Sequence, residues 1–360
     1  MPTSNNNRPS TYGTSNIVRS RTATQRRQDE ALRLRRLGMT YIAIARELGF
    51  TPNGVARAQS AAEAVRAAER RERERLSQGA INAVASHTTT SQSDFVSNRT
   101  FGMEAEFFGI TAQQAIDALA VEGITCTFEG YTHRVLTHWK IVTDGSVTST
   151  GTGIGYGLEL VSPILRGRQG IEEAIKVLDT IRRAGGKVNK TCGLHIHIGM
   201  NNLTGSELMK VVDTYVANQN NINRFLARSR HNNGYCLPFT ETLGSIPSRN
   251  YSALRRANTM TETAGLVSLM SSAPKYRVVN LNKYSSYGTF EFRQHQGTLN
   301  GEKVASWVKF LMSLIEKATS MADASQDFGS LANLMSETNL SAETQSFLNR
   351  RAERLGGSRN

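Results

Sequence analysis

Cysteine, proline and long apolar runs are scarce in this sequence of 360 residues, which has 3 cysteines and 7 prolines. Cys126, Cys192 and Cys236 are isolated and odd in number, so they imply neither a disulfide framework nor a zinc site. No apolar run approaches the ~20 residues that a membrane span needs, and the polar first residues lack the apolar core of a secretory signal. We therefore expect a cytoplasmic protein without a membrane partner, inside a bacterial host cell if a phage encodes it.

Acidic residues are outnumbered, and the positive excess is uneven. The chain carries 43 Lys and Arg against 30 Asp and Glu, a net charge of +13. Residues 1–99 hold 16 basic and 8 acidic residues, which is +8 of that total. A basic segment of this kind favours a polyanionic partner, nucleic acid first, although a solvated basic tail has the same composition. The length suggests about two domains.

The basic segment has helical spacing after a polar start. Residues 1–25 are poor in apolar side chains, and we expect them to be disordered. Apolar residues three or four apart predict one helix over 28–37 and a second after Thr40, which can cap it. Thr51 and Pro52 are typical of the start of a third helix. A charged helix follows to residue 78, with a run of alternating charges that favours a solvated spacer.

The order of helix, glycine turn and capped helix resembles the helix-turn-helix of resolvase-like and sigma-like proteins, over about thirty residues. This resemblance implies a DNA-binding module over 26–78, with DNA contacts from Asn53, Arg57 and Gln59. The same apolar spacing would also fit a small helical domain that docks on a protein. Residues 79–99, rich in Ser and Thr, are interpreted as the linker.

Three later segments alternate apolar with functional side chains, which is the period of a β-strand. Each alternation places its polar residues on one strand face: Glu104 and Glu106 in 101–108, His195 and His197 in 193–199, and Glu291, Arg293 and His295 in 289–295. Glu159 lies in a fourth such segment. Carboxylates this close repel one another unless they are protonated or bridged by cations, so a shared face predicts a Mg²⁺ and nucleotide site. The alternative is a half-exposed edge strand.

Other segments complete the expected architecture. Strands are predicted at 125–129, 138–143 and 276–284, and helices near 112–119, 171–184, 204–230, 249–272 and 304–315. Residues 285–288 have the length of a hairpin connection between two strands. The glycine-rich residues 151–157 fit neither a P-loop nor a dinucleotide fingerprint, and a hairpin tip is the simpler interpretation. We expect a catalytic domain over 100–322 and a helical tail over 323–360.

Five motifs, in their order, resemble those of the amidoligase family, relatives of glutamine synthetase and glutamate–cysteine ligase. They are Gly-Met-Glu-Ala-Glu (102–106), Asp-Gly-Ser (144–146), Gly-Leu-Glu-Leu-Val-Ser-Pro (157–163), Cys-Gly-Leu-His-Ile-His-Ile-Gly (192–199) and Phe-Glu-Phe-Arg-Gln-His-Gln-Gly-Thr (290–298). The resemblance implies an α+β fold like that of glutamine synthetase, with a curved antiparallel sheet and helices on one face. It also implies a carboxylate–amine ligase that uses ATP, forms an acyl phosphate and makes an amide or isopeptide bond.

The resemblance also implies roles for individual residues. The residues that would bind Mg²⁺ or Mn²⁺ are Glu104, Glu106, Glu159, His195 and Glu291. Arg293 would offset charge on the transferred phosphate, and His197 would bind phosphate or orient a neighbour. Asp144 and Ser146 would lie near the incoming amine, although Asp-Gly-Ser is also an ordinary turn. Arg277, Asn282 and Lys283 are weaker candidates for contacts with ATP. The carboxylate and amine substrates stay unidentified, with a peptide or protein among the options.

Two other functions fit the same residues. A metal-dependent nuclease or hydrolase would also use clustered acids and histidines beside a DNA-binding module. A DNA-binding regulator or phage accessory protein could carry an inactive ligase domain. A nuclease would cut DNA without nucleotide, whereas a ligase would release ADP only when an amine and a carboxylate are present.

Overall fold

The computed structural model describes residues 22–36, 39–50, 59–65, 67–68, 71, 97–130, 132–148, 157–238, 248–322 and 327–356. The chain divides after Ser91 into two compact units. No helix in these described ranges is long and apolar enough to cross a membrane.

The first unit is built from short helices around a small core of its own. Helix α1 spans Ala23–Arg36 and α2 spans Tyr41–Glu47, and residues 59–65 are also helical. The Thr40 side chain accepts a hydrogen bond from the backbone N–H of Ala43, as predicted for a capping residue. The core is made of small and aliphatic side chains from all three segments: Ala31, Leu32, Leu34, Ile44, Ala45, Ala61, Ala64, Val65 and Ala68.

One prediction about this unit is corrected by the structure, and another stays a prediction. Helix α1 already includes residues 23–25, which the sequence predicted to be disordered, because its helical hydrogen bonding begins with Arg26 N–H donating to Thr22 O. Asn53 and Arg57, the predicted DNA contacts, lie outside the described residues. Gln59 lies in the third helical segment and is exposed. The helix-turn-helix interpretation therefore stays a prediction.

The second unit is organised on an open, mostly antiparallel sheet with strand order β2-β3-β4-β1-β6-β8-β7 and with β5 paired to β1. Among the strands within the described residues, β2 and β3 are the one parallel pair. The strands are β1 Thr100–Phe107, β2 Cys126–Phe128, β3 Trp139–Asp144, β4 Gly157–Val161, β5 Leu165–Arg166, β6 Gly193–Gly199, β7 Val279–Asn280 and β8 Thr289–Gln296. Strands that carry the functional motifs therefore become neighbours although they are far apart in sequence.

The register gives the sheet one apolar and one polar face. Met103 pairs with Ile196, and Ile196 pairs with Phe292, which builds the apolar face across three strands. One residue along, Glu104 pairs with His195 on the other face. Since successive side chains of a strand point to opposite sides, the alternation read from the sequence holds for β1, β4 and β6.

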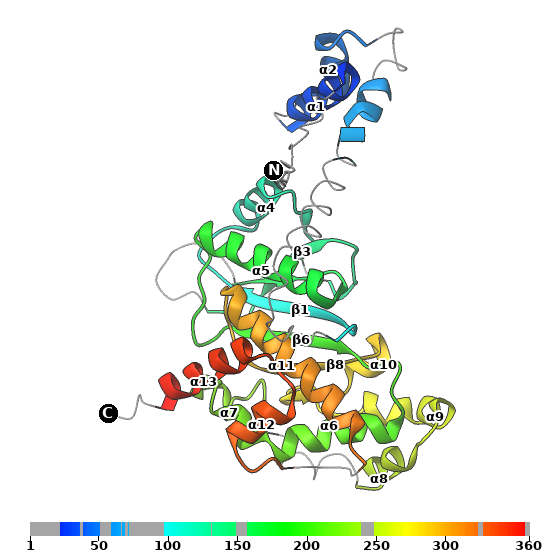
Figure 1. The fold of residues 1–360 in the computed structure, drawn as a ribbon, viewed down its shortest axis with the longest axis vertical. Coiled ribbons are helices and arrows are strands. Elements are labelled where there is room, and N and C mark those ends of the chain that lie inside the picture. The colour runs from blue at the N-terminus through cyan, green and yellow to red at the C-terminus, as the bar shows by residue number, and fades with distance from the viewer. Residues whose placement is uncertain are drawn as a thin grey trace, which may run out of the picture. The chain divides into compact units, whose positions relative to one another are not determined.

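Helices cover the apolar face. In Figure 1, α5 (Gly167–Arg183), α11 (Gly301–Ser320) and α6 (Gly205–Ala217) follow one another along the sheet, and α11 packs against both others. The shorter helices are α4 Ala112–Val121, α7 Gln219–Asn223, α8 Ser248–Arg256, α9 Met260–Ser271 and α10 Lys283–Tyr287, with a 3-10 turn at Arg228–Arg230. The sheet and these helices enclose one large hydrophobic core.

The C-terminal segment belongs to this core as well. Helix α12 spans Leu331–Glu337 and α13 spans Ala342–Gly356. Leu334, Met335 and Leu348 are buried in the same hydrophobic cluster as the sheet. The predicted helical tail is thus packed against the unit, because apolar residues at helical spacing give each short helix a face to bury.

Three local predictions differ from the structure. The expected single helix over 204–230 is interrupted after Ala217 and again after Asn223. Of the expected strand 276–284, only Val279–Asn280 forms a strand, beside an isolated bridge between Arg277 and Leu237, and the predicted hairpin turn is the helix α10, closed by Gly288 at φ +63°. Residues 97 and 99 of the predicted linker pack onto the unit, where Ser97 and Arg99 donate hydrogen bonds to Glu316.

Candidate metal and nucleotide site

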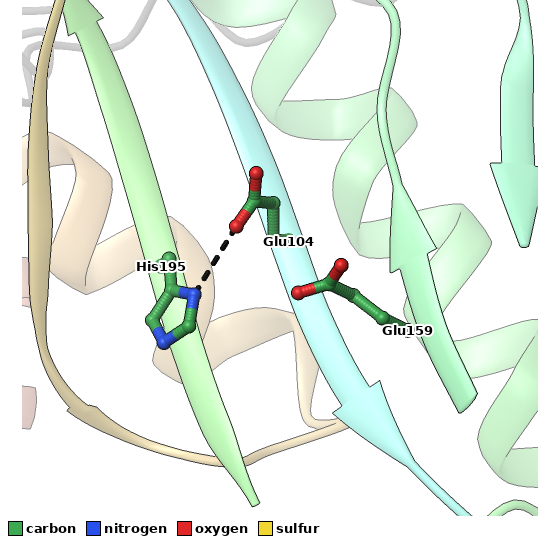
Figure 2. A group of neighbouring side chains, drawn as sticks. All are labelled: Glu104, Glu159 and His195. Atoms are coloured by element: carbon green, nitrogen blue, oxygen red, sulfur yellow. Dashed lines mark hydrogen bonds and ion pairs between the residues drawn. The ribbon is translucent and has the colours of Figure 1, made fainter. Parts of the chain in front are cut away.

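Three neighbouring strands bring the centre of the polar face together. Figure 2 shows Glu104 on β1 between His195 on β6 and Glu159 on β4. Nδ1 of His195 lies 3.2 Å from Oε2 of Glu104, and Nε2 of His197 lies 3.2 Å from Oε1 of the same carboxylate. The two imidazoles on alternate positions of β6 therefore flank one glutamate, as strand periodicity requires.

Strand β8 adds a buried carboxylate and a guanidinium. Glu291 is fully buried and pairs with His197 across the sheet, and its Oε1 lies 3.7 Å from His195 Nδ1. Nη1 of Arg293 donates to Oε1 of Glu291, while Nδ2 of Asn280 donates to Oε2 over 2.7 Å. Both oxygens of this carboxylate are thus held in place, which fixes its direction toward the histidines.

A third acid group lies at the other end of the face. The side chains of Glu106, Asp144 and Glu159 can each offer an oxygen within 4.8 Å of the others. Two further groups meet the same limit, Glu104 with Glu159 and His195, and Glu104 with His197 and Glu291. The three sets overlap, so the acids form a continuous line across the sheet. Ser146 donates from both its N–H and its hydroxyl to Oδ1 of Asp144, each over 2.7 Å.

The charges of these acids are not equivalent. Burial and the neighbouring charges of Glu104, Glu106, Asp144 and Glu291 raise the pKa of Glu159 well above its usual value. Burial also opposes ionisation of Glu104, but the charges and hydrogen bonds of His197 and His195 hold its pKa well below the usual value. The pKa of His197 is raised, because attraction to Glu104 outweighs its burial. Burial and the repulsion of neighbouring carboxylates therefore act most visibly on Glu159.

A β-bulge moves His295 to the opposite face from the one predicted. Ile196 pairs with Phe292 and Leu194 with His295, so β8 carries one more residue than β6 between the two pairs. The extra residue inverts the alternation, and His295 turns toward the helices, where its ring centroid lies 5.6 Å from that of Trp307. Burial there, with the charge of Arg351 nearby, lowers its pKa to about 3. Arg293, before the bulge, stays on the polar face.

Gly193 lets a second guanidinium approach the acids. A Cβ atom at this position would lie 3.0 Å from His195 Nε2, 3.3 Å from Arg230 Nη2 and 3.4 Å from Glu106 Oε1. Its backbone N–H donates to Oε2 of Glu106 over 2.6 Å. Arg230 is buried and donates through Nη2 to the backbone oxygen of Arg293. A Cβ atom at Gly193 would press on the ends of these three side chains, so the glycine leaves the room in which they approach one another.

A cavity of about 970 Å³ adjoins the acids on the side of Glu104, Glu159 and His197. Its wall contains the basic residues Arg99, Arg134, Lys140, Arg166 and Lys283, together with the apolar residues Phe101, Val135, Ile164 and Tyr287. A hollow with acids at one end and cations and apolar groups on its sides suits a ligand that has both phosphates and an apolar part.

Not all predicted residues meet here. Lys283 lines the cavity, although from helix α10 rather than from a strand. Arg277 and Asn282 are not among the lining residues, and the side chain of Asn282 donates to the backbone of Ser271 instead. Strand 276–284 was predicted too long, which placed Asn282 on the wrong element. It is Asn280 instead whose side chain donates a hydrogen bond to Glu291.

Sequence reasoning missed Lys140, Asn280 and Arg230. Lys140 had a signal, because it alternates with Val142 and Asp144 in the predicted strand and thus shares the polar face. Asn280 had the same kind of signal, two residues before Asn282. Arg230 had none: it lies after the break in the expected long helix, and only the fold brings it to Gly193.

Comparison with known proteins supports the family interpretation. Residues 97–315 match the model of a family described as "putative amidoligase enzyme", which is more than half of the chain. The match begins just before β1 and ends inside α11, so it includes every strand and all the acids above. A search of curated proteins finds no match.

Proposed function

The chain belongs to the amidoligase family, and we propose that it joins a carboxylate to an amine in a reaction that depends on ATP and Mg²⁺. Family membership supports an enzyme of the ligase class. The observation that carries the proposal is the line of acids and imidazoles on one sheet face, beside a cavity with basic and apolar walls. Neither an acidic site alone nor a basic cavity alone would suit ATP.

The donor set fits hard divalent cations. Burial and the crowding of carboxylates raise the pKa of Glu159, and bound cations would supply the positive charge that offsets both. Glu104, Glu106, Glu159, His195 and Glu291 are the residues we propose as ligands of Mg²⁺ or Mn²⁺. When bound, the metal would neutralise phosphate oxygens around the transferred phosphoryl group. A zinc site is disfavoured, because oxygen ligands dominate and no cysteine is among them.

The proposed reaction has two steps. A carboxylate oxygen of the first substrate attacks the γ-phosphorus of ATP, and the bond to ADP breaks, which gives an acyl phosphate. The amine nitrogen then attacks the acyl carbon, phosphate leaves with the bonding electron pair, and the amine loses a proton. Asp144, which Ser146 orients, is our candidate to receive that proton or hold the ammonium.

The chain's own cations would position the phosphates. Arg293 donates to the buried carboxylate of Glu291 through Nη1 and to the backbone oxygen of Tyr235 through Nε, so its guanidinium is fixed at the edge of the acids. Its burial keeps water from screening the charge it presents to a phosphate. We propose that the cavity holds the nucleotide, with the apolar Val135, Ile164 and Tyr287 near the base and Lys283 near the phosphates.

Calorimetric titration tests this site directly. Mg²⁺-ATP is titrated into the wild-type chain, Glu291→Gln and Glu172→Gln. Glu291→Gln keeps the shape of the buried residue but removes its charge, and we expect at least a tenfold loss of affinity. Glu172 is exposed on α5, away from the polar face, and its variant should bind like wild type. Equal affinity in all three proteins would refute the site.

The same protein separates the ligase from a nuclease. ADP release that needs both an amine and a carboxylate supports the ligase. Cleavage of plasmid DNA in Mg²⁺ without ATP, lost in Glu291→Gln, would replace it with a metal-dependent nuclease. Affinity for DNA with neither activity would favour a regulatory protein.

We propose further that the N-terminal unit binds duplex DNA. Two observations support this: three helical segments share one small core, and the basic excess of the chain is concentrated there. In the full chain, Arg57→Ala should weaken DNA binding and flatten its salt dependence by about one unit of log–log slope. Unchanged affinity and slope would remove Arg57 from the DNA interface.

A further inference from the structure

Residues 132–136, here called the strap, lie between β2 and β3 without regular secondary structure. Thr132, His133, Arg134 and Val135 of the strap line the cavity described above. His133, Arg134 and Val135 are exposed and Leu136 is only partly buried, so apolar packing alone holds the strap weakly. Something else must keep it in place over the cavity.

Polar contacts to three consecutive backbone carbonyls hold the strap. Nζ of Lys140 donates to the oxygen of Thr132 over 3.0 Å and to that of Arg134 over 2.6 Å. The hydroxyl of Tyr287 donates to the oxygen of His133 over 3.0 Å. The carbonyl of His133 lies between the two carbonyls that Lys140 holds, and it is held by Tyr287 of helix α10.

The two donors come from opposite sides of the cavity. Lys140 lies on β3, while Tyr287 ends α10 and is followed by Gly288 and then β8. Strands β4, β1 and β6 lie between β3 and β8 in the sheet, and their residues Glu159, Glu104 and His197 line the same cavity. The strap thus crosses the polar face above these residues.

Lys140 itself is buried and lies on the polar face, which would suit a catalytic lysine. Its hydrogen bonds in the described part of the chain go to the strap instead of a carboxylate. Two of the three N–H groups of this ammonium therefore hold backbone carbonyls.

We propose that Lys140 and Tyr287 are positioning residues that fasten the strap across the cavity and make it part of the binding site for a nucleoside triphosphate. The ligand class rests on the proposed function. The strap brings a cation, Arg134, and an apolar group, Val135, to the cavity wall. A ligand of mixed charge and apolar character would contact both, so opening the strap should weaken its binding.

Limited proteolysis of the full chain with trypsin measures strap opening without any ligand. The bond after Arg134 lies within the strap, and the bond after Lys190 lies in an exposed loop elsewhere and reports general unfolding. When opening is fast relative to cleavage, the cleavage rate follows the open population. Tyr287→Phe removes one hydrogen bond and keeps the ring, and we expect about a fivefold faster cut after Arg134. Lys140→Met removes two and should give tenfold or more.

Control variants separate the strap from general loosening. Tyr276→Phe removes the hydroxyl of another exposed tyrosine and should leave both cuts unchanged. Lys140→Arg keeps a donor and should restore much of the protection that Lys140→Met loses. An unchanged rate after Arg134 in both Tyr287→Phe and Lys140→Met overturns the inference, and so does a rise that is matched after Lys190.

Mg²⁺-ATP then links the strap to binding. It should slow the cut after Arg134 in wild type, and its dissociation constant should rise about fivefold in Tyr287→Phe. If the variants speed the cut but Mg²⁺-ATP protects no protein, the fastening of the strap stands and the nucleotide assignment fails. If the variants speed the cut and Mg²⁺-ATP binds all proteins equally, the strap is not part of the binding site.

Discussion

The two faces of the central sheet share the same strands but have opposite physical characters. On β8, Phe290 and Phe292 are fully buried against the helices, and Glu291 between them points at two histidines. The apolar face loses contact with water and stabilises the fold. The polar face carries carboxylates that repel one another. Burial and this repulsion raise the pKa of Glu159.

This contrast separates what holds the protein together from what it does. Side chains on the helical face are replaceable only at a large cost in stability, since they fill a close-packed core. Side chains on the polar face are expected to lower stability in the absence of cations and to determine binding. Three measurements test this difference between the two faces, and a fourth tests a helix end.

The largest effect is expected on the helical face. Phe292→Ala removes a fully buried ring that packs 5.5 Å from that of Tyr215, and it should lower the free energy of unfolding by about 3–5 kcal/mol. Thr289→Ala, on the polar face of the same strand, loses its hydroxyl contact with His197 and should cost about 1 kcal/mol. Denaturant titration measures both. Equal losses would mean that the two faces do not differ in this way.

Divalent cations should act through the polar face. At about 100 times its dissociation constant, Mg²⁺ should raise the free energy of unfolding of the wild type by about 2.7 kcal/mol. Glu159→Gln should be more stable than wild type by about 1 kcal/mol without metal, because one repelling charge is gone. It should gain less from Mg²⁺. A metal-free variant less stable than wild type would contradict the assigned repulsion.

His295 should make the free energy of unfolding fall as the pH drops into the acid range. Because burial lowers its pKa to about 3 from the usual 6.5, the folded state binds fewer protons than the unfolded state between these values. The contribution is fully present above pH 6.5 and falls by about 1.4 kcal/mol per unit as pH drops toward 3. His295→Gln should flatten that slope.

The smallest effect concerns a helix end rather than either face. Thr204 and Glu207 form a reciprocal capping pair at the start of α6. Thr204→Ala should lower the free energy of unfolding by about 1 kcal/mol, and Thr204→Ser should recover most of it. A Thr204→Ala protein that melts like wild type would show that tertiary packing alone holds this helix end.

Much of the site could be predicted because strands have a strict period. Glu104 and Glu106, Glu159, and His195 and His197 each follow from local alternation, with no knowledge of partners. The same rule failed at His295, since a one-residue bulge is a property of two paired strands and leaves no mark in one of them. It also failed at 276–284, where the strand is only Val279–Asn280 and the chain then enters helix α10.

Local sequence by itself determined which face of each strand is polar, where Thr40, Thr111, Thr204 and Thr259 cap helices, and which five motifs carry the family likeness. These depend on neighbours within a few positions. Only the tertiary structure decided that β1 lies between β4 and β6, that Arg230 reaches Gly193 and that Tyr287 holds the strap. Such contacts join residues up to 154 positions apart, and their energy appears only when the whole core has packed.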